Sequence, residues 1–235
     1  METIRKAIQR EADRSNSNSI KKAKRRVLLV DDHPIVREGL TEMVNHEDDL
    51  TVCGTAEEMN QALDQIDKLK PDLVVLDISL KGSNGIEVLK NIKVRYPKLL
   101  VLVLSMHDET LYALRALRAG AAGYIMKQEP AEKVLSSIRQ VLNGEISLSE
   151  NMEKKMMKQL VGGRAARTGS PLEDLSDREL EVFRLIGKGY STRQIAQELH
   201  LSIKTIESHR AHIKEKLNLK NAMELVQHAI QWQEA

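Results

Sequence analysis

The sequence is poor in cysteine and has no long apolar segment. Its one cysteine excludes an internal disulfide framework, and Cys53 lies in the strand-like stretch LTVCGTA, so we interpret it as a packed side chain. No apolar run approaches the length needed to cross a bilayer, and the charged N-terminus lacks the apolar core of a signal peptide. We therefore expect a soluble cytoplasmic protein with no membrane partner.

The chain also lacks a strong excess of either charge. A net charge of +2 gives no overall indication of nucleic-acid binding, so any basic surface must be local. With 235 residues and 41% hydrophobic content, the chain is long enough for two modest cores.

Short apolar runs alternate with helical patterns through the first part of the chain. Each run precedes a segment with apolar residues at helical spacing, which predicts a five-stranded parallel sheet with helices on both faces. Gly120 and Gly144 mark the ends of two of these helices. The five runs are VLLV, LTVCG, DLVVL, LLVLVLS and AGYIM.

This alternation ends near residue 150, where charged residues mix with the linker sequence GGRAARTGSP. Short helices follow, with N-cap signals at Ser176, Ser191, Ser202 and Asn221. We therefore predict an α/β domain followed by a small all-α domain. The expected boundaries are a flexible extension over 1–25, the α/β domain over 26–147, a partly helical linker over 148–173 and the helical domain over 174–235.

Carboxylates follow two of the predicted strands. Asp31 and Asp32 end RRVLLVDD, and Asp77 ends PDLVVLD. If the strand order is 2-1-3-4-5, these strands are neighbours at the switch point of the sheet and the acids converge. A charged group at the end of a buried strand needs partners, because an unpaired buried charge is costly. Clustered carboxylates repel one another unless a cation lies among them, and a site of few carboxylates with a phosphate oxygen suits Mg²⁺.

The same edge of the sheet gains Ser105 from the fourth strand and Lys127 from the fifth. A carboxylate nucleophile, a metal, a hydroxyl and a lysine are the groups needed to form and hold an aspartyl phosphate. This predicts that Asp77 is phosphorylated. Taken singly, each acid could instead end a strand or cap a helix, as Asp32 could for a helix starting near Pro34.

These features together make residues 26–145 resemble the receiver domain of two-component response regulators. Two positions depart from the family pattern: Lys81 stands where the family usually has proline, and Gln128 follows Lys127 where many relatives have proline. The resemblance implies that Asp77 is the phospho-acceptor, that Asp31, Asp32 and Asp77 hold Mg²⁺, that Ser105 and Lys127 contact the phosphoryl group, and that Ser105 and Tyr124 form the switch. In this switch Tyr124 is the aromatic residue that changes rotamer and turns inward, and its other interpretation is an ordinary core residue.

The C-terminal segments STRQIAQEL and TIESHRAHIKEKL have helix-turn-helix spacing, and lysine and arginine outnumber glutamate between residues 188 and 220. This part resembles the LuxR-type helix-turn-helix, and the whole chain resembles NarL/FixJ-type response regulators. The resemblance implies that Lys204, Thr205, His209, Arg210 and Lys214, together with Arg193 from the local basic excess, face the DNA backbone or groove, while Glu207, Ser208 and Ala211 lie near base edges.

The last helix carries an apolar stripe of Leu225, Val226, Ala229 and Ile230, which is either core or a dimer contact. The expected partners are a sensor histidine kinase, double-stranded DNA, a second copy when phosphorylated, and RNA polymerase.

Two other functions stay open from the sequence. An aspartate-based phosphohydrolase of the haloacid dehalogenase type wants a second acid two residues after the nucleophile, where this chain has Ser79. A DNA-binding regulator that works without phosphorylation is the other. We expect a phosphorylation-controlled transcription factor that is not an enzyme.

Overall fold

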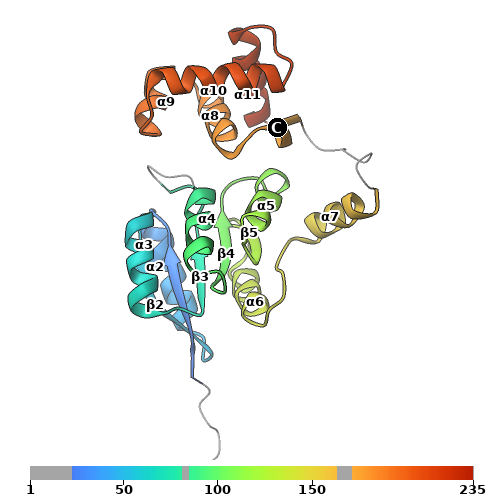
Figure 1. Ribbon diagram of the computed structural model, residues 1–235. Helices are drawn as coiled ribbons and strands as arrows, with labels where there is room; N and C mark the ends of the chain where they lie inside the picture. The colour runs from blue at the N-terminus through green and yellow to red at the C-terminus, as the bar shows by residue number, and fades with distance from the viewer. Residues whose placement is uncertain (1–22, 81–84, 163–170, 235) are drawn as a thin grey trace, which may run out of the picture.

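The computed structural model describes residues 23–80, 85–162 and 171–234. A sheet flanked by helices forms one part, and a cluster of helices lies against one end of it (Figure 1). The N-terminal extension, Lys81 and residues 163–170 of the linker lie outside the described residues. None of the helices in the described part is long and apolar enough to cross a membrane.

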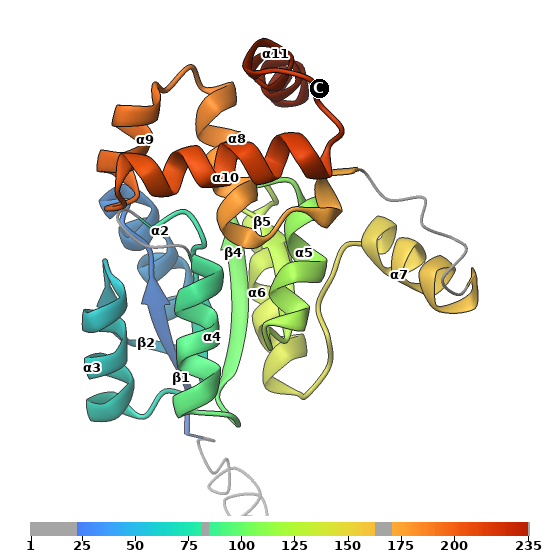
Figure 2. The same ribbon diagram turned by 45° about the horizontal axis from the view of Figure 1, so that its top comes forward.

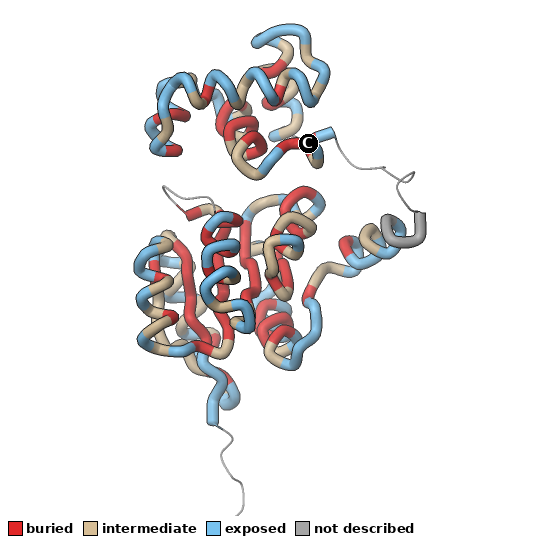
Figure 3. The backbone as a smooth tube through the Cα atoms, in the orientation of Figure 1, coloured by how far each residue is buried: buried red, intermediate tan, exposed pale blue. Residues whose placement is uncertain are grey.

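The sheet has five parallel strands in the order β2-β1-β3-β4-β5, which confirms the predicted switch point between β1 and β3. Burial on both faces explains why the strands are continuous apolar runs, and Figure 3 shows the buried residues concentrated along them. The strands are β1 (Arg25–Val30), β2 (Leu50–Ala56), β3 (Leu73–Leu76), β4 (Leu100–Ser105) and β5 (Gly123–Met126).

Alternate residues of the strands enter two separate cores. Leu29 and Val75 face one side, where they join α2 (Pro34–Asn45) and α6 (Ala131–Leu142). Leu28 and Val74 face the other, where α3 (Met59–Leu69), α4 (Gly85–Arg95) and α5 (Glu109–Arg118) cover the sheet. Gly120 and Gly144 follow the ends of α5 and α6 with φ of 102° and 86°, as predicted for helix C-termini.

The second part of the chain is helical. After α7 (Glu150–Gly162) and the 3₁₀ turn η2 (Pro171–Asp174) come α8 (Asp177–Gly187), α9 (Thr192–Glu198), α10 (Ile203–Lys216) and α11 (Ala222–Glu234). Ser176 and Ser191 form capping boxes with Glu179 and Gln194, and Ser202 accepts from the Thr205 N–H. Asn221 caps α11 by accepting from the Glu224 N–H. The Glu224 side chain accepts from the Lys220 N–H, one residue before the cap, so the second bond of a capping box is displaced by one residue.

Helix α8 joins the two parts of the molecule. Its first residue, Asp177, lies 2.8 Å from the Lys90 ammonium of α4 and 3.0 Å from the Arg115 guanidinium of α5. Arg115 also donates to the backbone oxygens of Leu172 and Glu173. The pKa of Asp177 is held below its usual value: burial acts against this, but the hydrogen bonds from Lys90 and Arg115 prevail. Figure 2 shows the helical part covering the end of the sheet.

Gly187 allows α8 and α11 to approach closely. A Cβ at this position would lie 2.5 Å from the Ala229 backbone oxygen, whereas a Cβ at Gly39 in α2 would have no neighbour within 4 Å. We expect Gly187→Ala to destabilise the helical part by about 1–3 kcal/mol through overpacking, and Gly39→Ala to stabilise α2 by up to about 1 kcal/mol. Calorimetric melting temperatures should therefore move in opposite directions, and a higher melting temperature in Gly187→Ala would contradict the packing argument.

Candidate functional site

The strand ends bring the predicted acids together. The Asp77 N–H donates to the Val30 oxygen at 2.8 Å, and the Asp31 N–H donates to the Ala56 oxygen at 3.0 Å. Strand pairing thus continues one residue beyond β1 and β3, which fixes both carboxylates at the same edge. At the ends of β4 and β5, the Lys127 N–H donates to the Ser105 backbone oxygen at 2.8 Å. The Lys127 side chain therefore extends from a fixed backbone position.

The Lys127 side chain bridges two of these acids. Its Nζ lies 2.6 Å from Asp31 Oδ2 and 2.8 Å from Asp77 Oδ2, and all three side chains are buried. Burial acts to lower the pKa of Lys127, but its hydrogen bonds to Asp31 and Asp77 raise it above the usual value. Burial raises the pKa of Asp77, and the hydrogen bond from Lys127 opposes that rise. Lys127 is therefore the principal group that favours the ionised form of Asp77 against the effect of burial.

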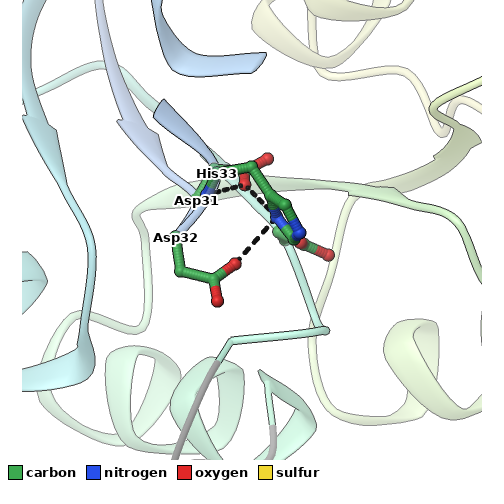
Figure 4. A group of neighbouring side chains, drawn as sticks. Asp31, Asp32 and His33 are labelled. Carbon is green, nitrogen blue, oxygen red and sulfur yellow. Dashed lines mark hydrogen bonds and ion pairs between the residues drawn. The ribbon is translucent and has the colours of Figure 1, made fainter. Parts of the chain in front are cut away.

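The donor set fits a hard divalent cation. Asp31, Asp32, His33 and Asp77 each offer a ligand atom, and these atoms lie within 4.8 Å of one another. Three carboxylates against the single charge of Lys127 leave two negative charges, which a divalent ion would neutralise. Figure 4 shows His33 Nδ1 lying between Asp31 Oδ1 at 3.1 Å and Asp32 Oδ1 at 2.9 Å. The sequence analysis did not select His33.

Ser105 and Tyr124 are both buried beside the acids. The Ser105 hydroxyl oxygen accepts from the His107 N–H at 3.0 Å, and the Tyr124 hydroxyl donates to the His107 oxygen at 2.7 Å. Only 1% of Tyr124 is exposed, so its ring already occupies the inward position. Burial raises the pKa of the Tyr124 hydroxyl, which stays protonated and remains a donor.

His107 links the acidic pocket to the helical part, and the sequence analysis missed it. The Ser79 hydroxyl lies 3.1 Å from His107 Nε2, and the imidazole stacks on Tyr112 with ring centroids 4.6 Å apart. Burial first, and then the charges of Arg184 and Lys188, lower the pKa of His107 to about 3, so this histidine is neutral near pH 7. Pairing of this kind depends on two loops meeting in space and leaves no periodic signal in the sequence.

Helix α10 presents one polar face to solvent. Lys204, Glu207, Ser208 and Ala211 are exposed and recur at the three- and four-residue spacing of a single helix face. Ile206 and Ile213 are fully buried on the opposite face, where they hold α10 against α8. An exposed polar helix face of this kind is what enters a DNA major groove in helix-turn-helix proteins.

The remaining predicted DNA-facing residues surround that surface. Thr205, His209, Arg210 and Lys214 are half-buried at its edges, and Arg193 is exposed on α9. The Thr205 hydroxyl lies 2.7 Å from the Ser202 hydroxyl, so it also serves the start of α10. The structure therefore brings all nine residues into the helix-turn-helix but distinguishes a fully exposed set from a flanking one.

Comparison with protein families identifies both parts of the chain. Residues 27–139 match the response regulator receiver domain, and residues 173–229 match the bacterial regulatory proteins of the luxR family. The oxygen regulatory protein NreC of Staphylococcus carnosus is 36% identical over 209 residues, which cover 87% of this chain and 96% of that protein. NreC of Staphylococcus haemolyticus is 35% identical over the same lengths.

Solved structures agree with these matches. RcsB from Salmonella enterica serovar Typhimurium, bound to the promoter rprA with the phosphomimetic BeF₃⁻, has a TM-score of 0.64 and 27% identity. That similarity covers 88% of this chain and 98% of RcsB. A LuxR-family two-component response regulator from Aurantimonas sp. SI85-9A1 has a TM-score of 0.55 and 31% identity, over 59% of this chain and 99% of that protein.

The strand order, the acidic pocket with its lysine, the exposed helix and these relatives lead to one conclusion. The chain belongs to the two-component response regulators that join a receiver domain to a LuxR-type DNA-binding domain.

Proposed function

We propose that a sensor histidine kinase phosphorylates Asp77, and that this phosphorylation controls dimerisation and sequence-specific DNA binding to regulate transcription. The observation that carries the proposal is the placement of the Asp77 carboxylate, 2.8 Å from the Lys127 ammonium and beside two further acids, in a chain that also carries a helix-turn-helix. We take 26–147 as the receiver domain, 174–235 as the DNA-binding domain and 148–173 as their linker.

The chemistry at Asp77 is phosphoryl transfer. An ionised Asp77 oxygen forms the new bond to phosphorus while the bond to the donor breaks, and the donor leaves with the electron pair. Lys127 neutralises charge on the phosphoryl oxygens, and the Ser105 hydroxyl donates to one of them. Mg²⁺ held by Asp31, Asp32 and Asp77 would offset the remaining negative charge during the transfer.

The signal begins when Ser105 turns toward the phosphoryl group. Its hydroxyl then exchanges its bond with the His107 N–H for one with a phosphoryl oxygen. Tyr124 and His107 adjust with it, because the Tyr124 hydroxyl donates to the His107 backbone. Because Tyr124 already lies inside, this switch acts through its hydrogen bonds and needs no inward rotation of the ring.

DNA binding is assigned to α10. Glu207, Ser208 and Ala211 on its exposed face read base edges, while other polar residues position the domain on the phosphates or line the groove. These are Lys204 on the same exposed face and the flanking residues Arg193, Thr205, His209, Arg210 and Lys214. In the dimer, two DNA-binding domains bind two half-sites, which raises the overall affinity for DNA. RNA polymerase is the partner through which the bound dimer regulates transcription.

The dimer contact on α11 is limited to its exposed apolar residues. Leu225 and Ala229 are fully buried against α8, so half of the predicted apolar stripe belongs to the core. Ile230 is 38% exposed and Met223 is 72% exposed. These two side chains are the part of α11 that a second copy can cover.

The first experiment tests phosphorylation directly. Incubation with acetyl phosphate and Mg²⁺ should add one base-labile phosphoryl group, detected by intact mass, because Asp77 alone lies at the end of β3, facing the two acids that follow β1. Asp77→Asn should remove the modification and Asp32→Ala should suppress it, whereas Asp64→Asn on the exposed face of α3 should leave it unchanged. An undiminished phosphoryl group on Asp77→Asn would refute the assignment.

The second experiment concerns pH. The pKa of Asp77 is raised by burial and lowered in part by Lys127, so Lys127→Gln should raise it further. A protonated carboxyl is not nucleophilic, so the rate of phosphorylation should fall as the pH falls through this raised pKa. In Lys127→Gln the same fall should begin at a higher pH than in wild type. Carboxyl NMR titration without divalent ions measures the shift. Lys133→Gln, which removes an exposed lysine, should leave the titration of Asp77 unchanged, and a lower pKa in Lys127→Gln would contradict the proposed role.

The third experiment separates backbone from base contacts. Lys204→Ala should weaken binding to cognate and random DNA equally and reduce the salt slope by about 1, because one phosphate contact is lost. Ser208→Ala should instead change sequence preference. Lys158→Ala, an exposed lysine on α7, serves as the control. If Lys204→Ala and Ser208→Ala affected cognate and random DNA alike, the assignment of base-reading residues on α10 would be wrong.

A further inference from the structure

A cleft of about 760 Å³ lies between the receiver and DNA-binding domains, and the acidic pocket opens into it. Its receiver side includes Asp32, Asp77 and Asp108, and the opposite side includes Arg184, Lys188 and Trp232. Carboxylates therefore face two cations across a space large enough for a phosphoryl group. Glu198 also lines the cleft, but the DNA-binding side still carries a net positive charge.

The two cations are next to each other at the C-terminal end of α8. Neither Arg184 nor Lys188 has an ion-pair partner among the described residues, although Arg184 is half-buried. Burial first, and then the charge of Arg184, lower the pKa of Lys188, so the pair repels itself in this position. A half-buried arginine and an exposed lysine placed together in this way are stabilised when an anion lies opposite them.

Helix α8 is fixed with these cations over the acidic pocket. Its first residue, Asp177, is tied to Lys90 and Arg115 of the receiver domain. The C-terminal end of the same rigid helix carries Arg184 and reaches the cleft above Asp77. The ion pairs at one end of α8 therefore hold the cations in place at the other.

Phosphorylation changes the charge that these cations meet. With three carboxylates, Lys127 and a divalent ion, the net charge of the pocket is zero. An aspartyl phosphate replaces one carboxylate charge with about two, so the pocket becomes negative by about one charge. Lys127 approaches from within the pocket, so the side of the phosphoryl group toward the cleft is open to a guanidinium, whose fork matches phosphoryl oxygens.

We propose that Arg184 and Lys188 bind the phosphoryl group on Asp77 across the cleft, so that the DNA-binding domain completes the phosphorylation site. This inference rests on the proposed phosphorylation of Asp77. Phosphorylation then strengthens the docked arrangement of the domains, and in that arrangement the face of α10 formed by Lys204, Glu207, Ser208 and Ala211 remains exposed. The covered acyl phosphate is also shielded from water.

Trp232 provides a direct readout, because it is the chain's one tryptophan and lines the cleft. Full-length protein is titrated with beryllium fluoride and Mg²⁺, a mimic of the phosphoryl group, and tryptophan fluorescence reports binding. Loss of a charge-assisted hydrogen bond in Arg184→Gln should weaken binding about tenfold, and Arg184→Lys should restore part of it. Lys188→Gln should have a smaller effect in the same direction.

The lifetime of the phosphorylated protein is the second readout. Arg184→Gln should lose the phosphoryl group several-fold faster than wild type, as followed by intact mass, because the acyl phosphate is less covered. Lys220→Gln removes an exposed charge of the same domain outside the cleft and should change neither readout. Asp177→Asn weakens the docking of α8, so the effect of Arg184→Gln should shrink in that background.

The outcomes separate this inference from the proposed function. If Asp77 is phosphorylated but Arg184→Gln matches wild type in both affinity and lifetime, the cations do not bind the phosphoryl group. An undiminished effect of Arg184→Gln in the Asp177→Asn background would also overturn the inference, because the residue would then act without docking. Absence of phosphorylation in wild type would instead refute the proposed function. If inorganic phosphate changed the fluorescence of Asp77→Asn as much as beryllium fluoride changes that of wild type, the cleft would be a site for free anions. That result would overturn the inference as stated.

Discussion

The buried ion pairs of Lys127 with Asp31 and Asp77 are the interaction on which the rest of the site depends. Carboxylates at the ends of apolar strands are costly to bury unless cations and hydrogen bonds compensate them. Lys127 supplies part of that compensation and leaves a deficit of positive charge, which the proposed divalent ion would offset. The same burial raises the pKa of Asp77, and the hydrogen bond from Lys127 opposes that rise. In the proposed reaction Lys127 therefore favours the ionised nucleophile and also neutralises charge on the phosphoryl group that Asp77 receives.

Coupling between the domains follows from the position of α8. One end of this helix is tied to α4 and α5 through Asp177, and the other borders the cleft above Asp77. His107 lines this cleft, stacks on Tyr112 and lies 3.1 Å from the Ser79 hydroxyl. In the proposed mechanism, a change of charge at Asp77 acts on α8 of the DNA-binding domain without a direct contact to α10. The polar face of α10 is exposed in this docked arrangement.

Much of this site could be predicted because strand periodicity determines where strand ends lie. Once the runs ending on Asp31, Asp77, Ser105 and Lys127 are recognised as parallel strands, their last residues must share an edge, and the observed strand order makes them converge. Helix caps were predictable for a similar reason, because Ser176, Ser191 and Ser202 act within one turn. The apolar stripe of α11 was ambiguous from its pattern, because core and dimer contacts have the same spacing.

The sequence by itself determined the elements, their order, the acidic pocket and the helix-turn-helix, because each depends on local patterns or on the shared edge of a parallel sheet. Only the tertiary structure decided which residues meet across loops and between domains. Ser79 meets His107, and Arg184 lines the same cleft as Asp77, over separations at which no periodicity operates. These contacts depend on how α8 docks on the receiver domain, and that docking is set by side-chain ion pairs and shape complementarity between surfaces distant in the chain.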